Sequence, residues 1–381
     1  MRAQRRSICH AYEMVSTDRL MRLHAEHGQS PWLDNLKRSL ITSGDLAGIR
    51  DAGVRGLTSN PTIFQKAIQG SADYDEQFRS LISADNSIID CYWAMVLQDI
   101  HGALDVFESV YKNSNGGDGF VSVEVDPNLA HDHSATLLAG QHLWETVSRA
   151  NLMIKIPATV PCLESVQAMI AAGRNVNVTL IFSLDRYQKV MDAYLAGLEE
   201  RLDAGLSING ISSVASFFIS RVDAEVDKRL DLIGTPTALA LRGRAAVAQA
   251  KLAYDGFRTT FSGLRWEALA QHGASVQRPL WASPSTKNPG YPDTLYVDEL
   301  IGHDSVNTLP DATLEAFADH GTLRTTIDQN VHESHQVWAA LAEVGVDMDD
   351  VARQLEDEGV LSFQKSFDEL LAALSDKAQT F

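Results

Sequence analysis

The chain has 381 residues, of which 45% are hydrophobic and 22% charged, and it carries a formal net charge of −18. This composition is ordinary for a globular enzyme, and the acidic excess argues against nucleic acid as the main partner because phosphate backbones recruit basic surfaces. No apolar run is long enough to predict a membrane span, and three scattered cysteines favour a reducing cytoplasm over a disulfide framework or a zinc site.

Short β-rich segments alternate with longer helical ones along the chain. In chain order, the predicted strands are Pro31–Leu36, Gly56–Asn60, Phe120–Pro127, Leu152–Thr159, Asn175–Phe182, Ile211–Ser220, Arg278–Ser283 and Ser305–Leu309. The predicted helices include Ser87–Tyr111, His133–Ala150, Leu184–Ala204, Thr237–Ser262, Leu309–Gly321 and Val331–Ala378. This alternation predicts an α/β fold, either a parallel (β/α)8 TIM barrel with additional helices at the termini or, as the less favoured alternative, an open doubly wound sheet.

The ends and one long loop complete the expected organisation. We expect residues 1–13 to be a disordered extension and residues 14–381 to form a single barrel domain that includes the C-terminal helices. The segment Pro284–His303 is rich in proline, glycine, asparagine and aspartate, which is typical of a long βα connection acting as a lid or a phosphate loop. The last helical segment is expected to pack across the barrel.

Three consecutive predicted strands carry polar residues on one face. The third strand places Glu124, the fourth Lys155 and the fifth Asn177 and Thr179 opposite their aliphatic neighbours. Side chains alternate between the two faces of a strand, so the aliphatic set suits the helix layer and the polar set points into the barrel. Burying a charge costs several kcal/mol unless it is paired. This pattern favours a functional site, although a purely structural ion pair between Lys155 and Glu124 is the alternative.

A lysine in such a place suggests imine chemistry. Desolvation among aliphatic neighbours, or a nearby cation, favours the neutral amine, which attacks a ketone to form a Schiff base. Glu124, acting through a water held by Thr179, is a candidate for moving the protons that this reaction requires. Arg221 follows the sixth strand, and Ser283 and Lys287 follow the seventh, in the quarter of a barrel that commonly binds phosphate.

These residues lie in segments that together resemble the transaldolases, in particular a bacterial branch of this Schiff-base class I aldolase superfamily. The resemblance covers roughly residues 28–375 and is carried by QSPWLDNLKR (29–38), GLTSNPTIF (56–64), VSVEVDP (121–127), MIKIPAT (153–159), NVNVTLIFS (175–183), SSVASFFISRVD (212–223) and RPLWASPSTKNP (278–289). It implies the transfer of a dihydroxyacetone unit from sedoheptulose 7-phosphate to glyceraldehyde 3-phosphate in the pentose phosphate pathway. No cofactor and no metal are implied.

The resemblance also assigns roles to single residues. Lys155 matches the Schiff-base lysine, Glu124 and Thr179 match the pair that positions the catalytic water, and Asp34 matches an aspartate that handles a substrate hydroxyl proton. Sugar-binding positions are matched by Asn60, Asn177 and Ser216, and a phosphate-binding arginine is matched by Arg221. Many transaldolases carry a further arginine after the seventh strand, whereas this chain offers Lys287 there, a point charge without the bidentate fork of arginine.

Several other interpretations stay open at this stage. A fructose-6-phosphate aldolase-like enzyme that releases dihydroxyacetone, or a non-catalytic phosphosugar-binding barrel, would use a similar constellation. Two histidine pairs, His131 with His133 and His332 with His335, lack a third ligand at a recognisable spacing, which disfavours a metal site. We expect small-molecule sugar phosphates as the only partners, with no nucleic acid and no membrane, and a monomer or homodimer.

Overall fold

Eight parallel strands close into a barrel in the order in which they occur along the chain. The computed structural model describes residues 17–380, so the extension predicted at residues 1–13 lies outside the described residues. The strands are β1 Gln29–Leu33, β2 Leu57–Thr58, β3 Val121–Glu124, β4 Leu152–Pro157, β5 Val176–Ile181, β6 Ser213–Phe218, β7 Gln277–Ala282 and β8 Ser305–Leu309. Each pairs with its sequence neighbour, and β1 also pairs with β8. The predicted (β/α)8 barrel is confirmed, and the open-sheet alternative is wrong because no edge remains.

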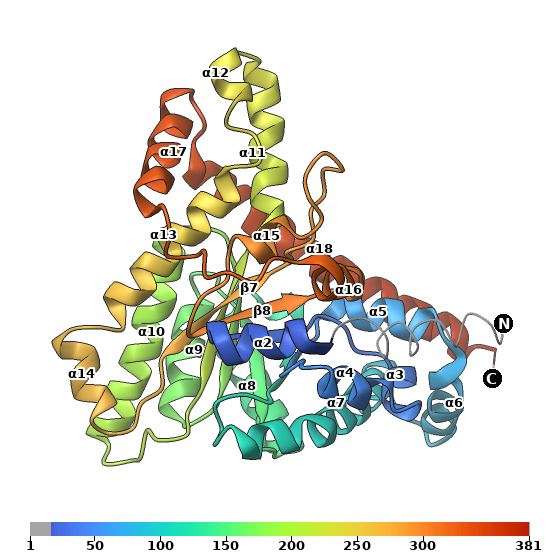
Figure 1. Cartoon of the computed structure of the whole chain (residues 1–381). Coiled ribbons are helices and arrows are strands. Elements are labelled where there is room, and N and C mark those ends of the chain that lie inside the picture. The colour runs from blue at the N-terminus through green and yellow to red at the C-terminus, as the bar shows by residue number, and fades with distance from the viewer. Residues whose placement is uncertain (1–16, 381) are drawn as a thin grey trace.

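Helices surround this barrel (Figure 1). They are α2 Thr17–His27, α3 Arg38–Thr42, α4 Asp45–Asp51, α5 Pro61–Gln69, α6 Asp75–Ser83, α7 Ile88–Asn113, α8 His133–Val147, α9 Cys162–Ala171, α10 Leu184–Asp203, α11 Ser220–Ile233, α12 Pro236–Leu239, α13 Ala245–Thr260, α14 Leu264–Ala270, α15 Leu295–Asp298, α16 Asp311–His320, α17 Val331–Glu343 and α18 Met348–Ala378, with 3-10 turns η1 Ala72–Tyr74 and η2 Pro127–Leu129. None of these described helices combines the length and apolarity that crossing a membrane requires.

Two predicted helices are each divided into two by a glycine. The segment Thr237–Ser262 was expected as one helix but forms α12 and α13, because Gly243 between them has φ of 70° and donates its N–H to Asp227. The segment Val331–Ala378 likewise forms α17 and α18, separated at Gly345 with φ of 94°. Glycine accepts this left-handed backbone at little steric cost, so the chain turns where helical periodicity alone predicted continuation.

Predicted strands overrun the observed ones mainly at their C-terminal ends. The first was expected to reach Leu36 but ends at Leu33, and the sixth was expected to reach Ser220, which instead begins α11. The residues beyond each strand leave the hydrogen-bonded ladder and form the βα loops, where barrel active sites lie. Asp34 and Arg221 therefore stand on loops or helix starts at one end of the barrel.

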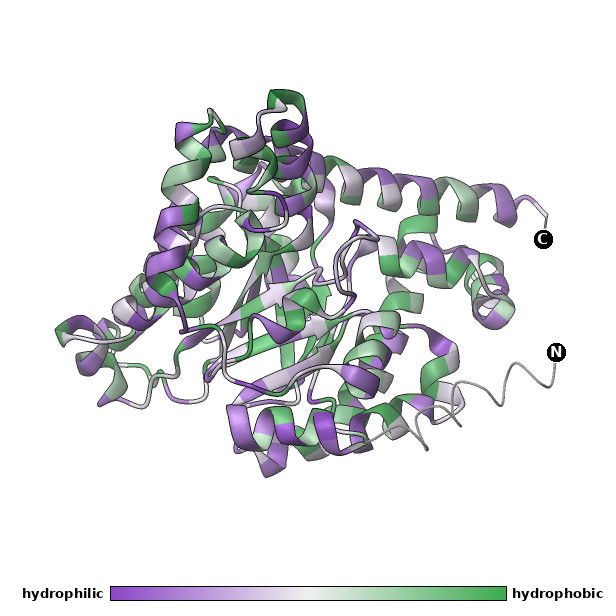
Figure 2. Ribbon diagram, turned by 45° about the horizontal axis from the view of Figure 1, so that its top comes forward, coloured by the Kyte–Doolittle hydropathy of each residue, from purple (hydrophilic) through white to green (hydrophobic). Residues whose placement is uncertain are grey.

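The C-terminal helix α18 crosses that same end. It contacts α5, α7, α11, η2 and β5, which belong to different sides of the barrel. Its first turn is capped by the Asp347 carboxylate, which accepts the backbone N–H groups of Asp349 and Asp350. Gly359 lets it approach closely, because a Cβ there would lie 3.0 Å from Leu180 Cδ2 on β5. Figure 2 shows helices with one apolar and one polar face, the pattern expected for elements packed on a central sheet.

Candidate active site

Two oppositely charged side chains from neighbouring strands meet inside the barrel. Glu124 on β3 is in register with Lys155 on β4, and Lys155 Nζ lies 2.9 Å from Glu124 Oε2. The lysine also donates to the backbone oxygen of Ser59, at 3.2 Å. The side chains of Lys155 and Glu124 are only 5% and 4% exposed. Both residues therefore point into the barrel, as predicted.

Burial shapes the electrostatics around this pair. Burial raises the pKa of Glu124 above its ordinary value, and the positive charge of Lys155 opposes that rise. Burial also raises the pKa of Asp34, while Lys155 and a 2.8 Å hydrogen bond from Thr58 Oγ1 act in the opposite direction. The ring of Phe363 lies 5.6 Å from Lys155 Nζ and covers the amine from the α18 side. One lysine and two carboxyl groups with raised pKa values thus share a desolvated interior.

The fifth strand adds two polar residues to this interior. Thr179 is in register with Pro157 on β4, and its buried hydroxyl has no hydrogen-bond partner within residues 17–380. Asn177 Nδ2 donates to Ser122 Oγ at 3.0 Å, and Ser216 Oγ donates to Asn177 Oδ1 at 2.7 Å. Asn177 therefore holds Ser216 in place by a direct contact, whereas the Thr179 hydroxyl is free to bind a small molecule.

A cavity of about 270 Å³ opens above these residues, at the C-terminal ends of the strands. The predicted site residues that line it are Asp34, Asn60, Lys155, Thr179, Ser216, Arg221 and Ser283. Glu124 and Asn177 do not line the cavity but contact Lys155 and Ser216, which do. The amine of Lys155 is thus both buried in the barrel and open to a cleft.

Asn60 and Ser283 owe their places to local backbone requirements. Asn60 caps α5 by accepting the Ile63 N–H at 3.0 Å, and the residue also lines the cavity. Ser283 has φ of 54°, and its carbonyl oxygen accepts the Ser220 N–H at 3.3 Å. That bond extends the β6–β7 pairing into the loop and places Ser283 beside the start of α11, where Arg221 lies.

Three cations approach one another at the rim of the cavity. Burial lowers the pKa of Lys287, and the positive charges of Arg221 and Lys66 lower it further, while Asp34 has the opposite effect. Burial also lowers the pKa of Arg221. Lys287 does not line the cavity itself, but the charges that act on it belong to Arg221, Lys66 and Asp34, which do.

Sequence reasoning did not identify several residues that line the cavity. They are Thr58, Thr62, Ile63, Lys66, Phe218, Ala282, Thr308, Pro310, Ser362 and Phe363. Thr58 was detectable, because it belongs to a predicted strand and is polar. Ser362 and Phe363 were not, because α18 reaches the cavity only through its crossing of the barrel.

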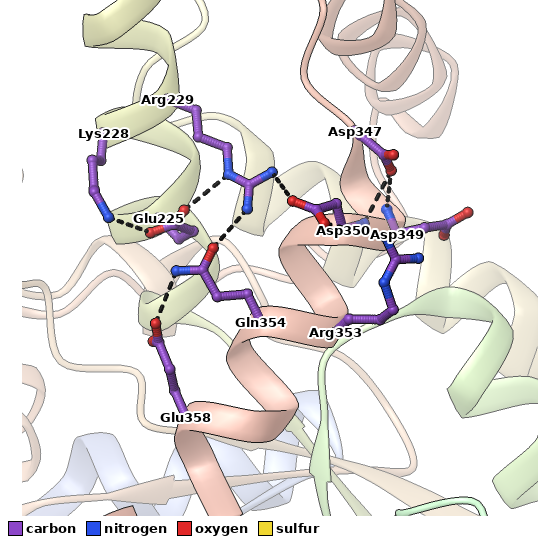
Figure 3. A network of polar contacts seen from close by, with 9 residues as sticks. All are labelled: Glu225, Lys228, Arg229, Asp347, Asp349, Asp350, Arg353, Gln354 and Glu358. Carbon is purple, nitrogen blue, oxygen red and sulfur yellow. Dashed lines mark hydrogen bonds and ion pairs between the residues drawn. The ribbon is translucent and has the colours of Figure 1, made fainter. Parts of the chain in front are cut away.

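A polar network anchors the start of α18 to α11 (Figure 3). Arg229 on α11 donates to Glu225 Oε1 at 2.9 Å and to Gln354 Oε1 at 2.8 Å, and lies 2.8 Å from Asp350 Oδ2. Gln354 in turn donates to Glu358 at 2.8 Å. The helix that carries Arg221 and the helix that carries Phe363 are therefore fixed relative to each other.

A second, larger cavity of about 580 Å³ lies at the opposite end of the barrel. Its lining includes Arg55 and Arg278, which both approach the buried carboxylate of Asp118, with Arg55 Nε at 2.8 Å and Arg278 Nη2 at 3.5 Å. The indole N–H of Trp32 donates to the same carboxylate at 2.8 Å. None of the predicted site residues lies there. Over the described range, no group of three or more His, Cys, Asp or Glu residues is placed to hold a metal ion.

Comparison with known proteins agrees with this geometry. The family described as Transaldolase/Fructose-6-phosphate aldolase matches residues 31–374. A protein of Parafrankia sp. named transaldolase is 52% identical over 352 residues, which cover 92% of this chain and 95% of that protein. Transaldolase 1 of Streptomyces coelicolor is 49% identical over 365 residues, covering 95% and 96% of the two chains. The transaldolase of Thermobifida fusca is 51% identical over 349 residues, covering 91% and 95%.

Proposed function

The chain belongs to the transaldolase/fructose-6-phosphate aldolase family, and from this premise we propose that it transfers a dihydroxyacetone unit from sedoheptulose 7-phosphate to glyceraldehyde 3-phosphate, a step of the pentose phosphate pathway. The observation that carries the proposal is the amine of Lys155, which is buried beside Glu124 and yet lines the cavity at the C-terminal end of the barrel. Only a nucleophile in that position forms an imine that is shielded from bulk water.

The proposed reaction begins with attack of the Lys155 amine on the ketone carbon of the donor sugar. The resulting carbinolamine loses water and becomes an imine, which accepts electrons when the bond between the α and β carbons of the donor breaks. An aldehyde leaves, and the three-carbon unit remains on the lysine as an enamine. The enamine carbon then attacks the acceptor aldehyde, and hydrolysis of the new imine releases the product and restores the amine.

Proton transfers in this sequence are assigned to Glu124 and Asp34. The raised pKa of each carboxyl group brings it nearer to the working pH of an acid–base catalyst. The unpartnered hydroxyl of Thr179 is suited to hold a water between Glu124 and the carbinolamine. Asp34 lines the cavity, which supports its assignment to proton exchange with the sugar hydroxyl at the bond that breaks.

Binding of the remaining substrate is assigned to residues around the cavity. Asn60 and Ser216 face it and supply hydrogen-bonding groups for sugar hydroxyls, with Asn177 supporting Ser216 from below. Arg221, Ser283 and Lys287 are assigned to the phosphate, because charged and hydroxyl donors at a barrel rim recognise phosphate oxygens. Sugar phosphates are the proposed partners, whereas a monomeric or homodimeric state and a cytoplasmic location stay predictions.

Covalent trapping tests the proposal directly. Borohydride reduction of the protein with fructose 6-phosphate, the donor of the reverse reaction, is expected to add one three-carbon unit, and peptide mapping is expected to find it on Lys155. Lys155→Ala is the matched control and should neither trap sugar nor turn over. A label on another lysine, or full activity in Lys155→Ala, would refute the proposal.

The acceptor dependence separates transfer from simple aldol cleavage. With fructose 6-phosphate as donor, transaldolase action is expected to produce sedoheptulose 7-phosphate only when erythrose 4-phosphate is present, with little free dihydroxyacetone in its absence. Release of dihydroxyacetone at the same rate with and without the acceptor would identify an aldolase. Binding of fructose 6-phosphate without trapping or turnover would identify a non-catalytic barrel.

A further inference from the structure

The rim of the active-site cavity holds an excess of positive charge. Arg221 and Lys66 both line the cavity and their charges act on Lys287, and Asp34 is the carboxyl group that acts on both Arg221 and Lys287. Lys155 and Glu124 form an ion pair and cancel in this count. Three cations against the two carboxylates that act on them, Asp34 and Glu358, leave a local excess of positive charge, in a chain whose overall net charge is −18.

These cations differ from most basic residues of the protein because they have no countercharge in contact. Within the described chain, none of the three takes part in an ion pair, although Arg22, Arg38, Arg55, Arg149, Arg186, Arg229, Arg244 and Arg265 each do. The carboxylate of Glu358 acts on Arg221 from a distance but accepts its hydrogen bond from Gln354 instead. Like charges gathered without partners are unfavourable unless an anion is bound between them.

Helical geometry explains why Lys66 belongs to this group. It lies on α5, whose residues Thr62 and Ile63 also line the cavity. Positions three and four apart lie on one face of a helix, so Lys66 follows both neighbours toward the cavity. The cap at Asn60 and the contact of Thr62 with Ser366 at 2.8 Å fix the rotation of this helix against α18.

We propose that Lys66 is a third cation of the phosphate subsite and binds the phosphate group of the sugar substrates opposite Arg221 and Lys287. This inference takes the identity of the sugar from the proposed function, whereas the binding of a phosphate group is argued from the charges alone. A phosphate monoester carries about −1.5 to −2 charges at pH 7, a sign opposite to that of the local charge excess. Lysine supplies a mobile point charge on a flexible stem, so Lys66 in the cavity lining and Lys287 next to it can both reach one bound phosphate.

Calorimetry with an unreactive pair of probes tests the proposal. Sorbitol 6-phosphate and sorbitol lack a carbonyl group, so their binding is independent of imine formation, and the ratio of their affinities isolates the phosphate. Lys66→Gln is expected to weaken the affinity for sorbitol 6-phosphate roughly three- to tenfold, as for loss of one partly exposed charge pair. The affinity for sorbitol should stay unchanged. Lys66→Arg is expected to restore most of the lost affinity. Added salt should lower the affinity for sorbitol 6-phosphate more in the wild type than in the Lys66→Gln variant.

A matched control removes a neighbouring charge that does not face the cavity. Lys365 is exposed on α18 and lies 3.8 Å from Glu369, which binds Gln65 of α5 at 2.8 Å. Lys365→Gln is expected to change neither affinity. An equal loss in Lys365→Gln and Lys66→Gln, or an affinity within twofold of wild type in Lys66→Gln, overturns the inference.

Kinetics provides a second readout and separates the two proposals. Lys66→Gln should raise KM for glyceraldehyde 3-phosphate more than for glyceraldehyde, with a much smaller change in kcat. A wild-type protein that binds sorbitol 6-phosphate more tightly than sorbitol but transfers nothing would refute the transaldolase function, and the binding ratio would still decide on Lys66. A wild type that does not distinguish the two probes would overturn the inference.

Discussion

The two ends of this barrel are both hollow and both polar, yet their charges are arranged in opposite ways. At the N-terminal end, Arg55 and Arg278 converge on one buried carboxylate, Asp118. At the C-terminal end, Arg221 and Lys287 have no ion-pair partner within residues 17–380. The N-terminal cavity is the larger, at about 580 Å³ against about 270 Å³.

This difference shows that cavity size and polarity do not identify an active site by themselves. Side chains that satisfy one another contribute to stability and have little binding capacity left. Within residues 17–380 the Thr179 hydroxyl has no hydrogen-bond partner, and the Arg221 guanidinium lies over the Phe218 ring but forms no ion pair, so both keep polar binding capacity for a substrate. The comparison predicts that substitutions at the C-terminal end change activity, whereas those at the N-terminal end change stability.

The largest effect is expected from Glu124→Gln. Glutamine keeps the shape of the side chain but cannot exchange a proton, so kcat is expected to fall by about 10² to 10⁴. Steady-state transfer assays measure this, and borohydride trapping with fructose 6-phosphate should still label Lys155, at a lower rate. A kcat within threefold of wild type would remove Glu124 from the proton-transfer steps and leave it a structural counter-ion.

Asp118→Ala, at the N-terminal end of the barrel, is expected to lower the free energy of unfolding strongly without lowering kcat. The change leaves Arg55, Arg278 and the Trp32 indole N–H without their acceptor, and breaking a buried ion pair costs about 3–5 kcal/mol. Denaturant unfolding measures the loss, and kcat of the folded fraction should stay close to that of wild type. A fall in kcat that exceeds the fall in folded protein would contradict the assignment of this end to stability.

A pH-dependent effect is expected at Asp223, which lies on α11 near Arg221 but away from the cavity. Burial is the main cause that raises its pKa to about 6, against an ordinary 3.8. The protonated carboxyl group contributes its full stabilisation of the folded state below pH 3.8. This contribution, roughly 3 kcal/mol at most, is lost as the pH rises through about 6.

Asp223→Asn tests this expectation because asparagine does not titrate. Asparagine keeps an oxygen that accepts the Ala246 N–H, now at 2.7 Å to Oδ1 of Asp223. The free energy of unfolding of the variant should therefore decline less than that of wild type between pH 4 and about 6. Parallel pH profiles for the two proteins would show that Asp223 is ionised throughout.

The smallest effect is expected from Arg229→Ala, which removes the centre of the network in Figure 3. Its partner Asp350 is half exposed, and the buried Glu225 also pairs with Lys228, so the cost in unfolding free energy is about 1 kcal/mol. Because this network fixes α18 to α11, KM for phosphorylated substrates should rise slightly as well. An exposed pair elsewhere, Arg265 with Glu199, supplies the control, since Arg265→Ala should leave KM unchanged.

Much of the fold and of the catalytic centre was predictable from local rules. Period-two alternation on three consecutive strands indicated that Glu124, Lys155 and Thr179 face the interior, and neighbouring parallel strands bring such residues together by register. Since each strand pairs with the next one along the chain, the order of strands in sequence is also their order in space. For these residues, the local sequence was enough to predict which way the side chains point and which strands are neighbours.

Other features were decided only by the tertiary structure. Phe363 covers Lys155 although more than 200 residues separate them, because α18 crosses the barrel, and no local pattern specifies that crossing. Whether a cation is paired is equally non-local: Arg278 at the start of β7 lies 3.5 Å from the Asp118 carboxylate, which comes from a distant loop, whereas Arg221 at the start of α11 forms no ion pair within residues 17–380. The sequence determined which side chains enter the barrel, and the packing of distant helices and loops decided which of them remain free to bind a substrate.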